Sequence, residues 1–232
     1  MASAAALAST CTAFLSSGRT YVLKIVSPTG DRTGGAEWVP LDRSAVEIDA
    51  SAAADAIGAT GYNRPEDVEI ATSTGNFPEN PNTLFVAVTS PLAPLVDNRI
   101  LAIDLDDKGD GRGQKGLSTA FVYDYVKVGL NATSEFEWPD NVALDHAGNL
   151  FITEDPGGSF ATKRKGDDIW AARPGRGKHA PAASVERFAS LTDCDAEPTG
   201  IYFAKGSDKL FVNVQHRGGD HLDKAVAITS DR

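Results

Sequence analysis

The chain has 232 residues, of which 41% are hydrophobic and 23% charged, and these proportions are typical of a globular protein with an apolar core. Its formal net charge of −10 disfavours nucleic acid and anionic membrane surfaces as partners, because like charges repel. No apolar run approaches the roughly 20 residues of a membrane-spanning helix, so we expect no membrane span.

The N-terminal segment, residues 1–19, is rich in Ala and Ser and contains no acidic residue. It resembles a secretory signal poorly, since no basic residue precedes its weak apolar stretch, and it is only loosely like an organellar transit peptide. A cut into a longer protein is a third interpretation, and it fits better. We therefore treat residues 1–19 as a tail or cut end and residues 20–232 as one domain.

Short strand-like segments dominate the domain, each rich in β-branched and aromatic residues and closed by Gly, Pro, Asn or Asp. In chain order the predicted strands are 20–26, 83–89, 99–105, 121–126, 150–153, 185–188 and 209–214. One helix is expected over residues 44–57, where an Ala-rich, weakly amphipathic register favours a short surface helix. Together these elements predict an all-β fold.

A motif that begins with proline occurs three times, as PEDVEI, PDNVAL and PTGIYF, and each copy continues after a turn with LFV or LFI. Repeats of this size, each holding several strands, predict the blades of a β-propeller. We expect Val68, Val142 and Ile201 to occupy equivalent buried positions. A β-sandwich with coincidental similarity is the alternative, which the shared opening of the copies makes less attractive.

The predicted propeller is incomplete, because the chain holds about four blades of this size. A blade buries its two faces only against neighbouring blades. We therefore expect the two end faces to be covered by another chain or by the missing blades.

Equivalent positions in neighbouring blades converge on the propeller axis, and the three motifs place polar residues there. These residues are Glu66, Asp67, Asp140, Asn141 and Glu197. Converging carboxylates repel one another unless a cation lies among them. An oxygen-only ligand set suits Ca²⁺, Mg²⁺ or Mn²⁺, with iron possible if a softer ligand joins. The alternative is that each acid caps a turn and faces water.

A second polar column lies where the following strands end, at Thr89-Ser90, Glu154-Asp155 and Gln215-His216. His216 follows its strand directly. It could bind a metal, donate a hydrogen bond to a substrate oxygen, or complete a buried network.

Four segments in this order, GYNRPEDVEI, PDNVALDHAGNLFITED, AEPTGIYF and LFVNVQH, resemble the C-terminal half of the PhoX-type alkaline phosphatases. The resemblance implies a six-bladed β-propeller with an axial cluster of iron and calcium ions that hydrolyses phosphate monoesters. Family precedent favours a secreted, periplasmic or organellar location. The family's N-terminal half, with its Trp-Gly-Thr and Cys-Glu-Glu motifs and its iron-binding cysteine, has no counterpart in this sequence.

The same resemblance implies roles for individual residues. The metal candidates are Glu66 and Glu197, followed by Asp140 and Asp155. The catalytic candidates are Arg64, Asn141 and His216.

Three functions remain open. The first is a phosphomonoesterase whose missing half comes from elsewhere, the second a non-catalytic accessory subunit of a larger assembly, and the third a calcium-dependent, lactonase-type propeller hydrolase. The missing cysteine motif favours the accessory subunit over the phosphomonoesterase. The RPED and QH motifs favour both of these over the lactonase-type hydrolase. Bound iron with calcium would support the first, calcium alone the third, and no bound metal the second.

Overall fold

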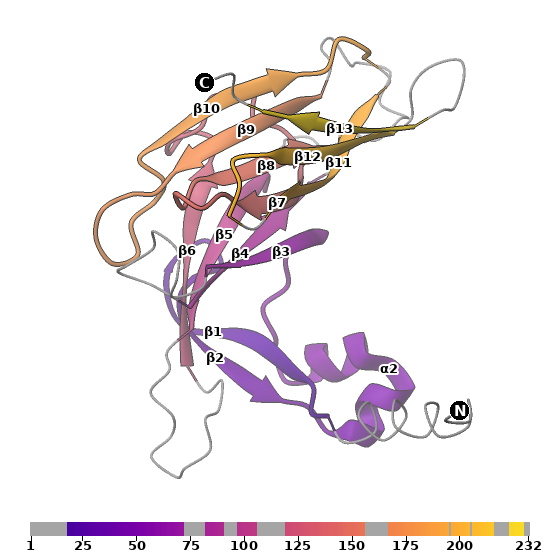
Figure 1. Cartoon of the computed structure of the whole chain (residues 1–232). Coiled ribbons are helices and arrows are strands. Elements are labelled where there is room, and N and C mark those ends of the chain that lie inside the picture. Colours follow the sequence, from indigo (N-terminus) through magenta and orange to yellow (C-terminus); the bar gives the residue numbers. More distant parts are fainter. Residues whose placement is uncertain are drawn as a thin grey trace, which may run out of the picture.

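The computed structural model describes residues 18–71, 82–90, 97–105, 119–155, 167–194, 196–204, 206–215 and 223–229. The described residues form three antiparallel sheets and a single helix (Figure 1). The predicted all-β fold is confirmed. In this described part of the chain, no helix combines the length and hydrophobicity that a membrane crossing requires.

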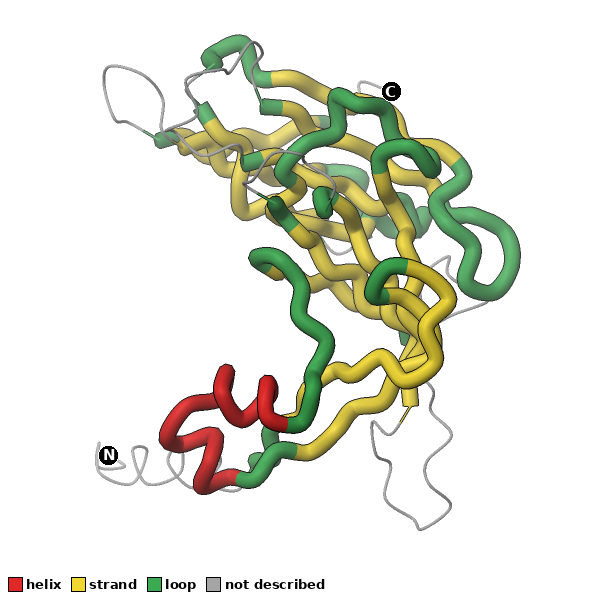
Figure 2. The backbone as a smooth tube through the Cα atoms, turned by 180° about the vertical axis from the view of Figure 1, so that it is seen from behind, coloured by secondary structure: helices red, strands yellow, loops and turns green. Residues whose placement is uncertain are grey.

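The first sheet has six strands. Its order is β1 (Tyr21–Gly30), β2 (Thr33–Pro40), β6 (Thr119–Lys127), β5 (Arg99–Leu105), β4 (Thr83–Val88) and β3 (Pro65–Ala71). Strands β3 to β6 form a meander in which each strand pairs with the next, and the β1–β2 hairpin is added at the edge of β6. The hairpin and the helix project away from the other two sheets (Figures 1 and 2).

The second and third sheets repeat the meander. The second has the order β10 (Ser184–Ser190), β9 (Asp168–Arg173), β8 (Leu150–Glu154) and β7 (Pro139–Leu144). The third has the order β11 (Glu197–Phe203), β12 (Leu210–Gln215) and β13 (Lys224–Ile228). The described residues thus form three sheets where about four blades were expected, because the β1–β2 hairpin extends the first sheet rather than forming a sheet of its own.

The helix α2 (Arg43–Ala56) covers the predicted range to within one residue at each end. The side chain of Asp42 caps it by accepting hydrogen bonds from the backbone N–H groups of Ser44 and Ala45. A break in the helical backbone at Asp49 divides it, and none of its residues is buried. The Ala-rich segment therefore forms the surface helix that its weak amphipathicity predicts.

The three proline motifs are structural repeats. They form β3, β7 and β11, which contact one another in that order. Each pairs with its following strand through a register irregularity. It falls between Pro65 and Val68 and between Pro139 and Val142 in the first two copies, and one residue further from the proline, between Thr199 and Tyr202, in the third. A β-bulge near the start of each motif strand shows that the sequence repeat is also a repeat of backbone geometry.

Apolar cores lie between successive sheets. The core between the first and second sheets includes Phe85, Tyr125, Val142, Ile152 and Trp170. The core between the second and third includes Ala143, Phe151, Ile169, Ile201 and Leu210. A third cluster joins the other face of the first sheet to the β1–β2 hairpin and contains Leu101, Ile103, Val122, Leu23 and Trp38.

The expectation of three equivalent buried positions holds for two of them. Val142 and Ile201 each face the preceding sheet and are only 3% and 7% exposed. Val68 occupies the same position in the first sheet but is 56% exposed, so the expectation that it is buried is wrong. The physical reason is that no sheet in the described part of the chain precedes the first, and this face lacks the neighbour that covers the other two.

Candidate functional site

The candidate site lies at the end of the sheets where the motif strands begin. Pro65 pairs with Val88 and Pro139 with Glu154, so the next residues, Thr89 and Asp155, occupy equivalent positions. Their backbone N–H groups donate to the carbonyl groups of the residues that precede the two prolines. This register places the residues of the strand-end column beside the entry to the motif strands.

The backbone at this entry is strained in two sheets. Arg64 and Trp138, which precede Pro65 and Pro139, have φ angles of 25° and 43°. A positive φ costs a residue with a β-carbon about 1–2 kcal/mol, and a following proline restricts the backbone further. Such conformations persist where the surrounding structure enforces them, and they are frequent at functional sites.

A cluster of carboxylates surrounds Asp140. Burial, which has the largest effect, and the negative charges of Asp155, Glu66, Glu197 and Asp67, in that order of effect, together raise the pKa of Asp140 to about 7. These five acids come from all three sheets. The structure therefore brings the four metal candidates of the sequence into one electrostatic neighbourhood.

The two leading metal candidates already have partners. The guanidinium of Arg64 lies 2.7 Å from the carboxylate of Glu66. The buried carboxylate of Glu197 accepts a hydrogen bond of 2.7 Å from the amide of Gln215. Within the described ranges, no three His, Cys, Asp or Glu side chains lie close enough together to hold a metal ion. The acids are thus near enough to repel one another, but their oxygens do not surround a common point.

Asn141 connects two sheets. Its side-chain oxygen accepts hydrogen bonds of 2.8 Å from the hydroxyl of Thr199 and from the backbone N–H of Gly200. Asp67, at the same motif position in the first sheet, accepts a hydrogen bond of 3.0 Å from the backbone N–H of Val142. The second residue after the motif proline is therefore a clamp between neighbouring blades. Sequence reasoning missed this role, although the recurrence of Asp or Asn at this position was a signal for it.

Of the two remaining catalytic candidates, the structure describes Arg64 but not His216. The side chain of Arg64 is 49% exposed and carries its charge beside Glu66. His216 lies outside the described residues.

A buried ionic network supports the entry to β3, and sequence reasoning missed it entirely. The carboxylate of Asp97 lies 2.9 Å from Arg99 and 2.5 Å from Arg32, and it accepts a hydrogen bond of 2.6 Å from the amide of Asn63. The contact with Arg99 is an ion pair without hydrogen-bond geometry. Because Asn63 immediately precedes Arg64, the network anchors the chain segment that carries the strained residue.

The fold and the site together define an incomplete β-propeller with acidic residues at the axial end of its blades. The chain belongs to the PhoX family, because the family model described as alkaline phosphatase PhoX matches residues 4–218. A comparison with curated proteins finds no match.

A solved structure, "Pseudomonas fluorescens PhoX in complex with vanadate, a transition state analogue", has the same fold. The two chains superpose with a TM-score of 0.63 at 22% sequence identity. The match covers 95% of this chain and 46% of the Pseudomonas fluorescens chain, so this chain spans less than half the length of that protein.

Proposed function

We propose that this chain is a phosphoesterase module whose axial carboxylates bind divalent cations, with calcium and iron the ions that the family resemblance implies. The observation that carries the proposal is the raised pKa of Asp140, to which four other carboxylates contribute. Clustered carboxylates destabilise a folded protein unless a cation offsets their repulsion. Their arrangement is therefore best explained by a bound cation.

The donor set fits a hard cation. Glu66, Asp140, Asp155 and Glu197 offer oxygen atoms alone, which are the ligands that Ca²⁺ prefers. A bound cation would neutralise the charge of a phosphate monoester and polarise its P–O bond. Arg64 would bind a substrate oxygen, and Asn141 would keep neighbouring blades in register so that acids from different sheets act together.

We further propose that a complete site needs additional polypeptide. The chain covers 46% of the solved PhoX chain, and its acids do not surround a common point within the described ranges. Further blades, from another chain or from a longer form of this protein, would cover Val68 and supply the missing ligands. Without them the chain would act as a non-catalytic subunit. A location outside the cytoplasm is the one that family precedent favours.

The test is to compare the wild-type protein with Asp140→Asn, which keeps the side-chain shape and removes one charge. We expect calcium to raise the melting temperature of the wild type and to bind the variant at least about tenfold more weakly, as one lost ligand charge predicts. Glu186→Gln, which removes an exposed acid from the same sheet, is the matched control and should bind calcium like the wild type.

Metal content and activity on p-nitrophenyl phosphate then separate the three functions. Iron with calcium, together with hydrolysis by this chain or by its complex with further blades, would support the phosphoesterase. Calcium alone, without phosphatase activity, would favour a lactonase-type hydrolase. If Asp140→Asn stabilises the protein and the wild type binds no metal, the acids are vestigial and the chain is an accessory subunit.

A further inference from the structure

The chain segment that leads into β3 is held at three consecutive residues. The carbonyl of Gly61 accepts a hydrogen bond of 3.3 Å from the guanidinium of Arg32, and the hydroxyl of Tyr62 donates one of 2.7 Å to the backbone carbonyl of Arg32. The side-chain amide of Asn63 donates a hydrogen bond of 2.6 Å to Asp97. Contacts at successive residues leave the segment little conformational freedom, so it fixes the entry to β3.

The carboxylate of Asp97 is the fixed point to which Asn63 is bound. The side chain of Asp97 is only 3% exposed, and its oxygen Oδ1 lies 2.5 Å from Arg32 and 2.9 Å from Arg99. Its other oxygen, Oδ2, accepts the hydrogen bond from Asn63. Two guanidinium groups therefore hold the carboxylate in one orientation, and a hydrogen bond to an ionised acceptor is stronger than one between neutral groups.

Arg64 follows directly and has a backbone conformation that needs such an anchor. Its φ angle is 25°, which is unfavourable for a residue with a β-carbon. Its carbonyl accepts a hydrogen bond of 3.2 Å from the backbone N–H of Thr89. From this backbone position the guanidinium of Arg64 lies 2.7 Å from the carboxylate of Glu66, one of the axial acids. The direction of the Arg64 side chain thus depends on a backbone conformation that its neighbours enforce.

The second sheet holds its own strained residue in the same way but with different residues. Trp138 has a φ angle of 43°, and the backbone N–H of the preceding residue, Glu137, donates a hydrogen bond of 2.9 Å to the buried carboxylate of Glu154. In both sheets a buried acid therefore binds the residue two places before the motif proline. Two unrelated sets of contacts that fix the same point of the backbone indicate that the position before the proline has to be held in place.

We propose that Asp97 is a positioning residue for phosphate binding: through Asn63 it fixes the backbone of Arg64 and so directs the guanidinium toward the axial acids and a bound phosphate. The inference rests on the proposed function, in which Arg64 binds a substrate oxygen. A guanidinium binds phosphate through directed hydrogen bonds, so its affinity depends on where the side chain is held. Neither Asp97 nor Asn63 belongs to the acids around Asp140, so a change at Asn63 should alter phosphate binding and leave cation binding intact.

The variant Asn63→Ala tests this link, because it removes the amide and leaves Asp97 paired with Arg32 and Arg99. The readout is modification of Arg64 by phenylglyoxal, measured by mass spectrometry of the intact protein after digestion. With calcium present, inorganic phosphate should protect Arg64 of the wild type. Half-protection in Asn63→Ala should need at least about tenfold more phosphate, since a small displacement of a binding group is costly. The affinity for calcium should not change.

Hydrogen exchange gives a second readout, which does not depend on phosphate. The amide of Thr89 donates to the carbonyl of Arg64, and it should exchange at least about threefold faster in Asn63→Ala because the anchored segment is loosened. The amide of Asp155 donates to the carbonyl of Trp138 at the equivalent place in the second sheet. Its exchange should stay at the wild-type rate.

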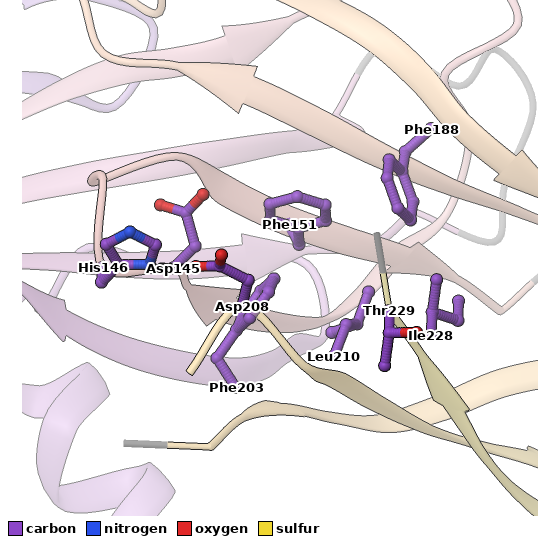
Figure 3. A pocket seen from close by; sticks show the side chains of 9 residues that line it. All are labelled: Asp145, His146, Phe151, Phe188, Phe203, Asp208, Leu210, Ile228 and Thr229. Carbon is purple, nitrogen blue, oxygen red and sulfur yellow. Dashed lines mark ion pairs between the residues drawn. The ribbon is translucent and has the colours of Figure 1, made fainter. Parts of the chain in front are cut away.

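The matched control is Asn149→Ala. It removes a hydrogen bond of the same kind, 2.8 Å long, from a side-chain amide to Asp145. This bond lies in the turn after β7, at the end of the strand away from the axial acids, where Asp145 borders a pocket between the second and third sheets (Figure 3). The control should leave both the phosphate protection of Arg64 and the exchange of Thr89 unchanged.

The outcomes separate this inference from the proposed function. If phosphate protects Arg64 equally well in the wild type and in Asn63→Ala, or if the exchange of Thr89 is unchanged, the positioning role is overturned and the proposed function stands. If Asn149→Ala weakens protection as much as Asn63→Ala does, the effect is a general loss of stability and the positioning role is again overturned. If phosphate does not protect Arg64 of the wild type, the proposed function and the positioning role fail together.

Discussion

Two charged clusters meet at the beginning of β3, and they are built on opposite principles. In the first, acids and bases are balanced: it contains Asp31, Asp97 and Asp124 with Arg32, Arg99 and Lys127. A hydrogen bond from Arg32 lowers the pKa of Asp31. In the second, burial and four neighbouring carboxylates raise the pKa of Asp140. The balanced network stabilises the fold, whereas the cluster around Asp140 gathers acids without matching bases and so costs stability. A cluster of this kind indicates a functional role.

The balanced network should be the more sensitive to mutation. Arg99 is 0% exposed, and its removal takes away one of the two arginine counter-charges of the buried acid Asp97, leaving Arg32 alone. We expect Arg99→Ala to lower the free energy of unfolding by about 3–5 kcal/mol in a urea titration. Arg43→Ala breaks an exposed ion pair with Glu47 and should cost less than about 0.5 kcal/mol. Equal losses in the two variants would mean that the network does not anchor the fold.

Substitutions of Asn141, whose side chain links the second and third sheets, should have the next largest effect on stability. Asn141→Ala removes two hydrogen bonds to the third sheet, which should lower the free energy of unfolding by about 1–3 kcal/mol, since a hydrogen bond contributes about 0.5–1.5 kcal/mol. Thr199→Val removes one of the same two bonds and should give about half the loss. If Asn141→Ala leaves stability unchanged but changes ligand binding, then Asn141 acts at the site rather than between the blades.

Much of the fold follows from local sequence. The apolar LFV and LFI segments form parts of β4, β8 and β12, and the proline motifs form the strands that contact one another across blades. The strands β2, β9 and β13 were not predicted, since TGGAEWVP, DIWAAR and KAVAI are rich in Gly and Ala, which have low strand propensity. Hydrogen bonding to neighbouring strands forms them in spite of their composition.

The site was predictable in outline only. The motif spacing predicted that Glu66, Asp140 and Glu197 converge, because equivalent positions in packed repeats must lie near one another. The burial of Arg99 was not predictable, because an arginine at the start of a strand normally faces water. The contacts of Glu66 with Arg64 and of Glu197 with Gln215 depend on side-chain directions that spacing does not determine. The role of His216 stays a prediction, since it lies outside the described residues.

The smallest expected effect, and the most specific, is the pH dependence of the carboxylate cluster. The pKa of Asp140 rises from an ordinary value of 3.8 to about 7 on folding. Between these values the folded protein retains a proton that the unfolded chain releases, so stability falls as pH increases, and it changes no further above the folded-state pKa.

The contribution of Asp140 to the pH dependence of stability is the difference between the wild type and Asp140→Asn. The free energy of unfolding of the wild type, measured in chelator, should fall between about pH 4 and pH 7 relative to Asp140→Asn, by on the order of 1 kcal/mol because water screens the partly exposed side chain. Calcium should remove the difference in slope, since a bound cation favours the ionised carboxylate and brings its pKa down. Parallel pH profiles of the two proteins in chelator would show that the acids do not repel one another. The cluster around Asp140 would then be no less stable than the balanced network around Asp97, and the argument that the axial acids bind a cation would fail.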